Sequence, residues 1–226
     1  MANKVLLSIK DLSIGHEGRV LCSGISFDIC EGDCIMLCGA NGSGKTTLMR
    51  ALASTQSDAE IAMIPARIPK IKGFTLKEFI RTSCYRQSDM GGHLSQDQEA
   101  YLDKAMERLN LRHLADRDIS TLSDGEFQKA GIAAALVRKA SVIMLDEPTA
   151  FLDAENRISV LQTLRSLCEA EGQTPLPAVI FSTHDLHDGL AVANKVIALG
   201  ADGIFRCTDG NLEDAVRSIF SVKHST

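Results

Sequence analysis

The residues with the clearest chemical potential form the segment GANGSGKT, residues 39–46, which directly follows the apolar run CIMLC. Its spacing matches GxxxxGK[ST], and the preceding strand and following helix are the context that this pattern requires. Glycines let backbone N–H groups converge on phosphate oxygens, Lys45 brings a positive charge to the β and γ phosphates, and Thr46 offers its hydroxyl to Mg²⁺. The nucleotide-binding residues predicted here are Gly39, Asn41, Gly42, Ser43, Gly44, Lys45, Thr46 and Thr47.

A second chemical feature is the acidic pair Asp146 and Glu147, which ends the apolar segment VIMLDEP. An acidic pair after a strand is often only a cap for the next helix. Next to a phosphate-binding loop it predicts more, because the ends of parallel strands deliver side chains to one ligand-binding edge. We expect Asp146 to hold Mg²⁺, usually through water, together with Thr46, and Glu147 to orient and polarise an attacking water.

The elements that position these residues follow from the apolar pattern. Short buried runs at 34–38, 141–146, 178–182 and 195–199 are separated by helical or loop material, which predicts an α/β core with a mainly parallel sheet. Residues 5–29 alternate with period two and predict an antiparallel β layer before that core. Residues 201–203 are expected to form a hairpin turn, and residues 212–220 an amphipathic helix.

Helical signals replace strand signals between Gly73 and Thr121. Thr75 and Glu78 have the spacing of a capping box, and residues 102, 105, 106 and 109 recur on one helical face. We therefore expect a helical subdomain inserted into the core, at 73–121 together with a following helix that extends to about residue 139.

The pentapeptide LSDGE at 122–126 indicates which class of P-loop protein this is. Ser123 and Glu126 form another predicted capping box, so the N-terminus of this helix is suited to face an anion. The segment resembles the signature motif of ABC ATPases. EPTAFLD, which ends at Asp153, resembles their D-loop, and His184 in STHD resembles their switch histidine. A lone histidine is more often structural, but this one follows an apolar strand, where it could reach a γ-phosphate or the attacking water.

The resemblance extends from about Val5 to Phe220 and implies one P-loop ABC cassette over residues 1–226, which binds and hydrolyses ATP with Mg²⁺. It implies a head-to-tail homodimer in which Ser123, Gly125 and Asp153 of one copy meet the ATP held by the other. It also implies integral membrane permease partners, indirectly a substrate-binding protein, and a cytoplasmic location on the inner face of the membrane. IAMIPARIPKIKGFTLKEFI and HLADRDISTLSDGE look most like ATPases that import iron-siderophores, haem or cobalamin.

Four positions depart from the family pattern. His16 stands where an aromatic residue usually stacks on adenine, and an imidazole can still stack there. Ala66 replaces the glutamine of the Q-loop, so a ligand for Mg²⁺ or water is missing. Asp124 and Glu126 add carboxylates to the signature motif, and Asp124 would repel a phosphate if its side chain turned inward.

Composition argues against several classes. The net charge of -5 with scattered basic residues gives no electrostatic footprint for nucleic acid, and no segment has the ~18 apolar residues of a membrane span. Cys30, Cys34 and Cys38 are interpreted as buried thiols rather than a metal site. The alternatives to a transport ATPase are a non-transport ABC ATPase and a weakly hydrolysing regulatory module. A GTPase, suggested only by NKVI at Asn194, lacks the aspartate that reads guanine.

Overall fold

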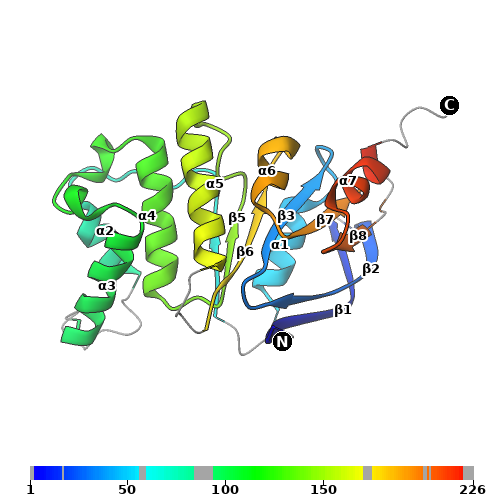
Figure 1. The fold of residues 1–226 in the computed structure, drawn as a ribbon, viewed down its shortest axis with the longest axis horizontal. Helices are drawn as coiled ribbons and strands as arrows, with labels where there is room; N and C mark the ends of the chain where they lie inside the picture. Colours follow the sequence, from blue (N-terminus) through cyan, green and yellow to red (C-terminus); the bar gives the residue numbers. More distant parts are fainter. Residues whose placement is uncertain are drawn as a thin grey trace.

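The described part of the chain contains two β-sheets, one of two strands and one of six, with helices on the larger sheet. The structure is a computed structural model that describes residues 3–16, 18–55, 60–83, 94–169, 175–200, 203 and 205–220. Figure 1 shows the small sheet at one end of the molecule and helices α2, α3 and α4 at the other. The larger sheet lies between them.

The small sheet is formed by β1 (Val5–His16) and β2 (Arg19–Cys30), which pair antiparallel. Ile25, Phe27 and Ile29 are buried and the residues between them are more exposed, as the period-two pattern predicts. The predicted antiparallel layer is confirmed.

The large sheet has the strand order β4-β5-β6-β3-β7-β8. All neighbouring pairs are parallel except β7 and β8, which are antiparallel. Its strands are β3 (Cys34–Gly39), β4 (Ile61–Ile64), β5 (Val142–Leu145), β6 (Ala178–Ser182), β7 (Lys195–Leu199) and β8 (Phe205–Thr208). The predicted α/β fold with a mainly parallel sheet is confirmed.

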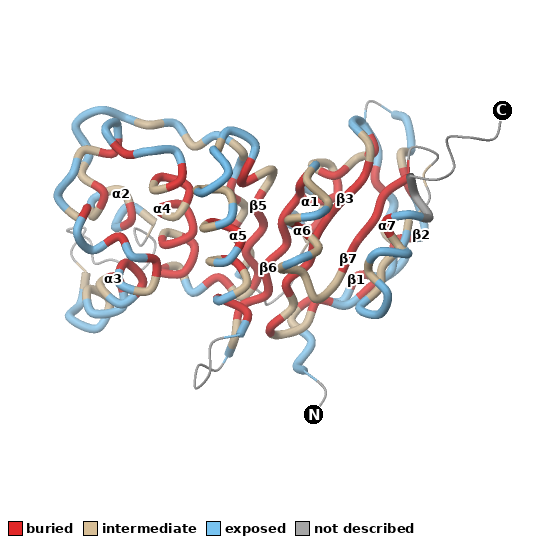
Figure 2. The backbone as a smooth tube through the Cα atoms, turned by 45° about the horizontal axis from the view of Figure 1, so that its top comes forward, coloured by how far each residue is buried: buried red, intermediate tan, exposed pale blue. Residues whose placement is uncertain are grey.

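Side chains of the central strands alternate between two hydrophobic cores, which explains why these strands are apolar throughout. Figure 2 shows these strands as buried. In β3, Met36 belongs to the core shared with α4 and α5, whereas Ile35 and Leu37 belong to the core shared with α1 and the small sheet. The central strands are thus buried on both faces, and the loops that follow them start from well-packed positions.

Seven helices are present in the described part of the chain, with 3₁₀ turns at Arg112–Leu114 and Ile119–Thr121. They are α1 (Lys45–Ala53), α2 (Leu76–Thr82), α3 (Gln96–Arg108), α4 (Asp124–Val137), α5 (Ala154–Cys168), α6 (Leu186–Val192) and α7 (Leu212–Phe220). The amphipathic helix predicted at 212–220 is α7, which packs against β7 and β8. None of the helices in this part of the chain combines the length and apolar character of a membrane span.

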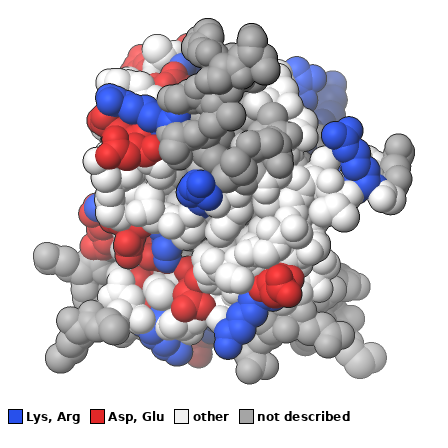
Figure 3. Space-filling model, turned by 90° about the vertical axis from the view of Figure 1, so that its right-hand side faces the viewer, with Lys and Arg blue, Asp and Glu red and all other residues white. Residues whose placement is uncertain are grey.

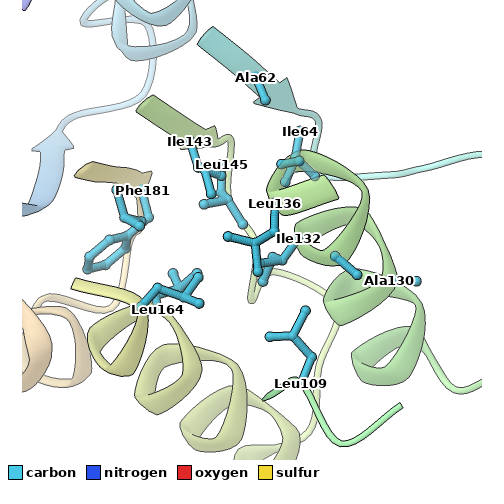
Figure 4. Packing of buried hydrophobic residues seen from close by; sticks show 14 of the residues in the cluster. Ala62, Ile64, Leu109, Ala130, Ile132, Leu136, Ile143, Leu145, Leu164 and Phe181 are labelled. Carbon is cyan, nitrogen blue, oxygen red and sulfur yellow. The ribbon is translucent and has the colours of Figure 1, made fainter. Parts of the chain in front are cut away.

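Helices α2 and α3 pack against α4, and α4 packs onto the edge of the large sheet. In Figure 4, Ile132 and Leu136 of α4 approach Ile64 of β4 and Leu145 of β5. The predicted Thr75–Glu78 capping box is present, with both reciprocal hydrogen bonds. These contacts agree with a helical unit attached to the sheet, although its boundaries remain a prediction.

Two strands were not anticipated as elements, β4 and β8. The segment FRCT of β8 contains polar residues, whereas the apolar segment IAMI of β4 was quoted only for its family resemblance. Ala201 and Asp202 of the predicted hairpin turn lie outside the described residues.

Asn194 has a structural role: its Oδ1 accepts from Cys34 N at 2.8 Å and its Nδ2 donates to Gly32 O at 2.9 Å. Within the described residues, Cys30, Cys34 and Cys38 are free thiols and no group of potential metal ligands gathers.

Candidate functional site

Three adjacent parallel strands, β5, β6 and β3, end at the same edge of the large sheet. The phosphate-binding segment follows β3, Asp146 and Glu147 follow β5, and His184 follows β6. In the β3–β6 ladder Leu37 is opposite Ser182, and in the β5–β6 ladder Leu145 is opposite Phe181, so the three strand ends are level. The sequence-distant residues predicted to do chemistry therefore meet at one edge.

The phosphate-binding loop needs its glycines for steric reasons. A Cβ at Gly39 would lie 2.4 Å from Leu199 O and 2.5 Å from Ser43 Oγ. Gly44 has φ 101°, a left-handed conformation that costs other residues strain, and it is the N-cap of α1. These glycines hold the tight loop between β3 and the N-terminus of α1.

Lys45 is the buried cation of this loop, with only 7% of its surface exposed. Its Nζ donates to Gly39 O at 2.9 Å and to Ala40 O at 3.2 Å. Burial lowers the pKa of the Lys45 amine, and the nearby charges of Glu147 and Asp146 partly offset that shift. The buried Ser43 hydroxyl has no hydrogen-bond partner among the described residues. An ammonium and an orphaned hydroxyl in one loop suit an incoming phosphate.

The acidic pair is tied to the loop by hydroxyl groups. Thr46 Oγ1 donates to Asp146 Oδ2 at 2.8 Å, and Ser182 Oγ donates to Asp146 Oδ1 at 2.9 Å. The same Ser182 oxygen accepts from Glu147 N at 2.8 Å. A hydroxyl and a carboxylate in contact form a hard-oxygen pair of the kind that Mg²⁺ prefers.

Glu147 and His184, the two residues predicted to act on the attacking water, contact each other. His184 Nε2 and Glu147 Oε1 are 2.5 Å apart, and both side chains are partly exposed. Glu147 has φ 48°, a left-handed conformation that costs a non-glycine residue about 1 kcal/mol or more and that occurs often at functional sites. In this backbone conformation the Glu147 carboxylate contacts the His184 ring.

His16 ends β1 and is exposed, opposite Arg19 in β2. Its strand reaches the phosphate-binding loop, because a Cβ at Gly44 would lie 3.1 Å from Ile14 Cδ1. His16 lies two residues beyond Ile14 at the end of the same strand, and its stacking on adenine stays a prediction.

The remaining predicted residues, Ser123, Gly125 and Asp153, form a second group at the N-termini of α4 and α5. Ser123 caps α4 in the predicted box with Glu126, and Asp153 caps α5 by accepting from Asn156 N at 2.8 Å. Asn156 joins the two ends, because a Cβ at Gly125 would lie 2.8 Å from its Oδ1. Hydrogen bonds from the backbone and the side-chain amide of Asn156 hold the pKa of Asp153 below its usual range.

The two groups do not meet within one chain. In Figures 1 and 2, α4 is separated from α1 by α5 and by strands β5 and β6. Ser123 and Gly125 thus cannot serve the phosphate-binding loop of their own chain.

A groove of about 230 Å³ contains two of the departures from the family pattern, Ala66 and Asp124. The guanidinium of Arg67 lies 4.2 Å from the centroid of the Phe151 ring, which is a cation–π contact. The Arg67 guanidinium is therefore engaged with the Phe151 ring. Asp124 is paired with Lys70 at 2.7 Å.

Sequence reasoning missed Ser182 and Lys70. Ser182 could have been noticed as the last residue of a buried strand directly before Thr183 and His184, where a polar side chain faces the ligand edge. Lys70 gave no comparable signal, because 54 residues separate it from Asp124.

Comparison with known proteins decides the family. The family model described as ABC transporter matches residues 22–150, which is more than half of the chain. The chain belongs to the ABC transporter ATP-binding family. It is therefore an ATP-binding protein of a family that hydrolyses ATP, which confirms the resemblance found in the sequence.

Individual ABC relatives cover most of the chain. The petrobactin import ATP-binding protein FpuC of Bacillus anthracis is 28% identical, over 86% of this chain and 78% of the relative. The aliphatic sulfonates import ATP-binding protein SsuB of Granulibacter bethesdensis is 33% identical, over 88% of this chain and 82% of the relative. A solved structure of an ABC transporter assigned to the metal-chelate type, in an inward-facing conformation, has a TM-score of 0.83 at 26% identity and covers 97% of this chain and 90% of its own.

Proposed function

We propose that this chain is the ATP-hydrolysing subunit of an importer and that it works as a head-to-tail homodimer. The observation that carries the proposal is the division of the site into two groups. Lys45, Glu147 and His184 meet at one sheet edge, whereas Ser123 and Gly125 lie beyond α5. In a dimer of two copies in opposite orientation, the sheet-edge group of each copy would face the group at the start of α4 in the other copy.

In this proposal the phosphate-binding loop holds the ATP phosphates through backbone N–H groups and the Lys45 ammonium. The Glu147 carboxylate orients the attacking water and polarises it as the water attacks the γ-phosphorus. His184, in contact with Glu147, would hydrogen-bond the γ-phosphate or that water. Ser182 keeps the backbone of Glu147 in place during this step.

Thr46 and Asp146 would hold Mg²⁺, since their oxygens already lie 2.8 Å apart. The ion would neutralise charge on the β and γ phosphates. Ala66 has no oxygen or nitrogen in its side chain, so it cannot add a ligand from the groove side.

The proposed partners are integral membrane permease subunits and, indirectly, a substrate-binding protein. This places the chain in the cytoplasm, on the inner face of the membrane. On the face seen in Figure 3, the basic side chains of the described residues are scattered among acidic and uncharged ones, so the described part of that face shows no basic patch for nucleic acid.

The proposed cargo is an iron chelate, haem or cobalamin. It is supported by the sequence pattern, by the petrobactin relative and by the metal-chelate type transporter. The relative that imports aliphatic sulfonates points instead to a sulfonate as the cargo. Deleting the gene and measuring uptake of ⁵⁵Fe-siderophore, haem, cobalamin and an alkanesulfonate decides between them, and loss of sulfonate uptake alone would contradict the proposed cargo.

The shared site is tested by mixing two inactive variants. Ser123→Ala is expected to bind nucleotide as a monomer but to dimerise poorly with ATP, whereas Lys45→Ala is expected to lose binding itself. A mixed dimer retains one site with both elements intact, so mixing should restore part of the ATPase activity. If mixing restores none, while both variants remain folded by circular dichroism, the shared site is wrong.

A further inference from the structure

The strongest unexplained contact lies at the start of α4, where Lys70 holds the acidic signature residue Asp124. Lys70 Nζ lies 2.7 Å from Asp124 Oδ1 and also donates to Leu122 O at 2.7 Å. The same ammonium lies 5.6 Å from the centroid of the Phe127 ring. The Lys70 side chain is 26% exposed and the Asp124 side chain is 64% exposed.

The backbone contact fixes the position of the cation independently of the carboxylate. Leu122 O and the Phe127 ring give the ammonium two contacts that do not involve the Asp124 carboxylate. The Asp124 side chain, by contrast, is mostly exposed and has no other polar contact within the described residues. Lys70 therefore sets where the Asp124 carboxylate rests.

The position of this pair matters because Asp124 is the first residue of α4. The positive end of a helix attracts an anion, but a free carboxylate beside it would repel a phosphate at the same place. The other added carboxylate, Glu126, is already engaged. Burial raises its pKa, but hydrogen bonds from the Ser123 backbone and hydroxyl and the charges of Arg117 and His113 outweigh that, so the pKa lies below its usual range.

We propose that Lys70 is a positioning residue for the composite ATP site. It neutralises Asp124 and holds that carboxylate aside, so that the γ-phosphate bound by a second copy can approach the N-terminus of α4. The inference rests on the proposed head-to-tail dimer. It assigns a function to a lysine that the sequence analysis did not single out as a site residue, and it explains how the signature segment accommodates an aspartate.

The test measures the ATP concentration that gives half-maximal dimerisation, by light scattering after size-exclusion chromatography, in a Glu147→Gln background. Lys70→Met is expected to raise that concentration roughly fivefold, because an exposed like-charge contact costs about 1 kcal/mol. Adding Asp124→Asn to Lys70→Met is expected to return it to within about twofold of the parent. Binding of ATP to the monomer should be the same in the Lys70→Met protein as in the parent.

Lys77→Met is the matched control, since the Lys77 side chain in α2 is 33% exposed, close to the 26% of Lys70, and also pairs with carboxylates, those of Glu99 and Asp103. It should leave dimerisation unchanged. If Lys70→Met dimerises like the parent, or if Asp124→Asn does not rescue it, the charge-compensating role is overturned. If the Glu147→Gln parent itself does not dimerise with ATP, the proposed dimer fails, and the inference about Lys70 fails with it.

Discussion

Removing the Ser182 hydroxyl should weaken both the fold and catalysis. Ser182 has no exposed surface, and its Oγ joins Asp146 to the backbone of Glu147. In Ser182→Ala the Glu147 N–H loses its acceptor, which costs about 1–3 kcal/mol for a buried donor. The Asp146 carboxylate loses one hydrogen bond but keeps that from Thr46 and is partly accessible to water, so its contribution is at the low end of about 1.5–3 kcal/mol.

We expect the free energy of unfolding to fall by about 2–3 kcal/mol, which is less than the sum because water can replace part of the lost contact. The melting temperature should fall by about 4–10 °C in a chain of this size. The kcat should decrease at least about tenfold, since a small displacement of a catalytic group is costly. The KM for ATP should change less than about threefold, because the contacts of the phosphate-binding loop remain.

Urea denaturation and steady-state ATPase kinetics on the same preparations measure both effects. Ser8→Ala is the control, because the Ser8 hydroxyl also donates to a carboxylate, Asp28, at 2.6 Å but is exposed. It should change the free energy of unfolding by less than about 0.5 kcal/mol. A Ser182→Ala protein with wild-type stability and wild-type kcat would refute the reasoning about this hydroxyl.

Three further predictions use the same protein. Glu147→Gln should bind ATP but hydrolyse it at least about a hundredfold more slowly in a phosphate-release assay, and wild-type turnover would remove Glu147 from catalysis. Ala66→Gln should lower the Mg²⁺ concentration for half-maximal ATPase by an amount on the order of 1 kcal/mol, and coincident titrations would show that position 66 has no metal role. Glu126 and Asp153 have lowered pKa values in the fold, so their stabilisation is present above their unfolded values of about 4 and is lost as the pH falls through the folded values. The free energy of unfolding should therefore decrease between about pH 5 and pH 2, and Glu126→Gln should flatten that decrease.

The sequence predicted best those parts of the fold that depend on local pattern. The apolar runs at 178–182 and 195–199 coincide with β6 and β7, because strands buried on both faces cannot contain polar interruptions. The capping boxes of Thr75 and Ser123 also follow from spacing alone, since the side chain and the backbone group that it meets are three residues apart. In the site, the phosphate-binding loop was found in the same way.

Features that depend on distant contacts were not predictable. Lys70 and Asp124 come together only because α4 packs beside the segment that follows β4. Ser182 acquires its role from the level ends of β5 and β6, which no local pattern encodes. The left-handed conformation of Glu147 is likewise a result of the loop that it enters, and its amino-acid type gives no sign of it.

The close approach of Asn156 to Gly125 changes how a mutational scan of this region should be interpreted. Any side chain at 125 collides with an atom of its own chain before it meets a nucleotide. Failure of a Gly125→Ala protein to support growth is therefore not by itself evidence for a nucleotide contact, because crowding between two helix ends would have the same result. Adding Asn156→Ala to the Gly125→Ala protein separates the two causes. If growth is restored, the collision with Asn156 was the cause. If growth is not restored, the cause was loss of the close approach of the nucleotide to the backbone at Gly125.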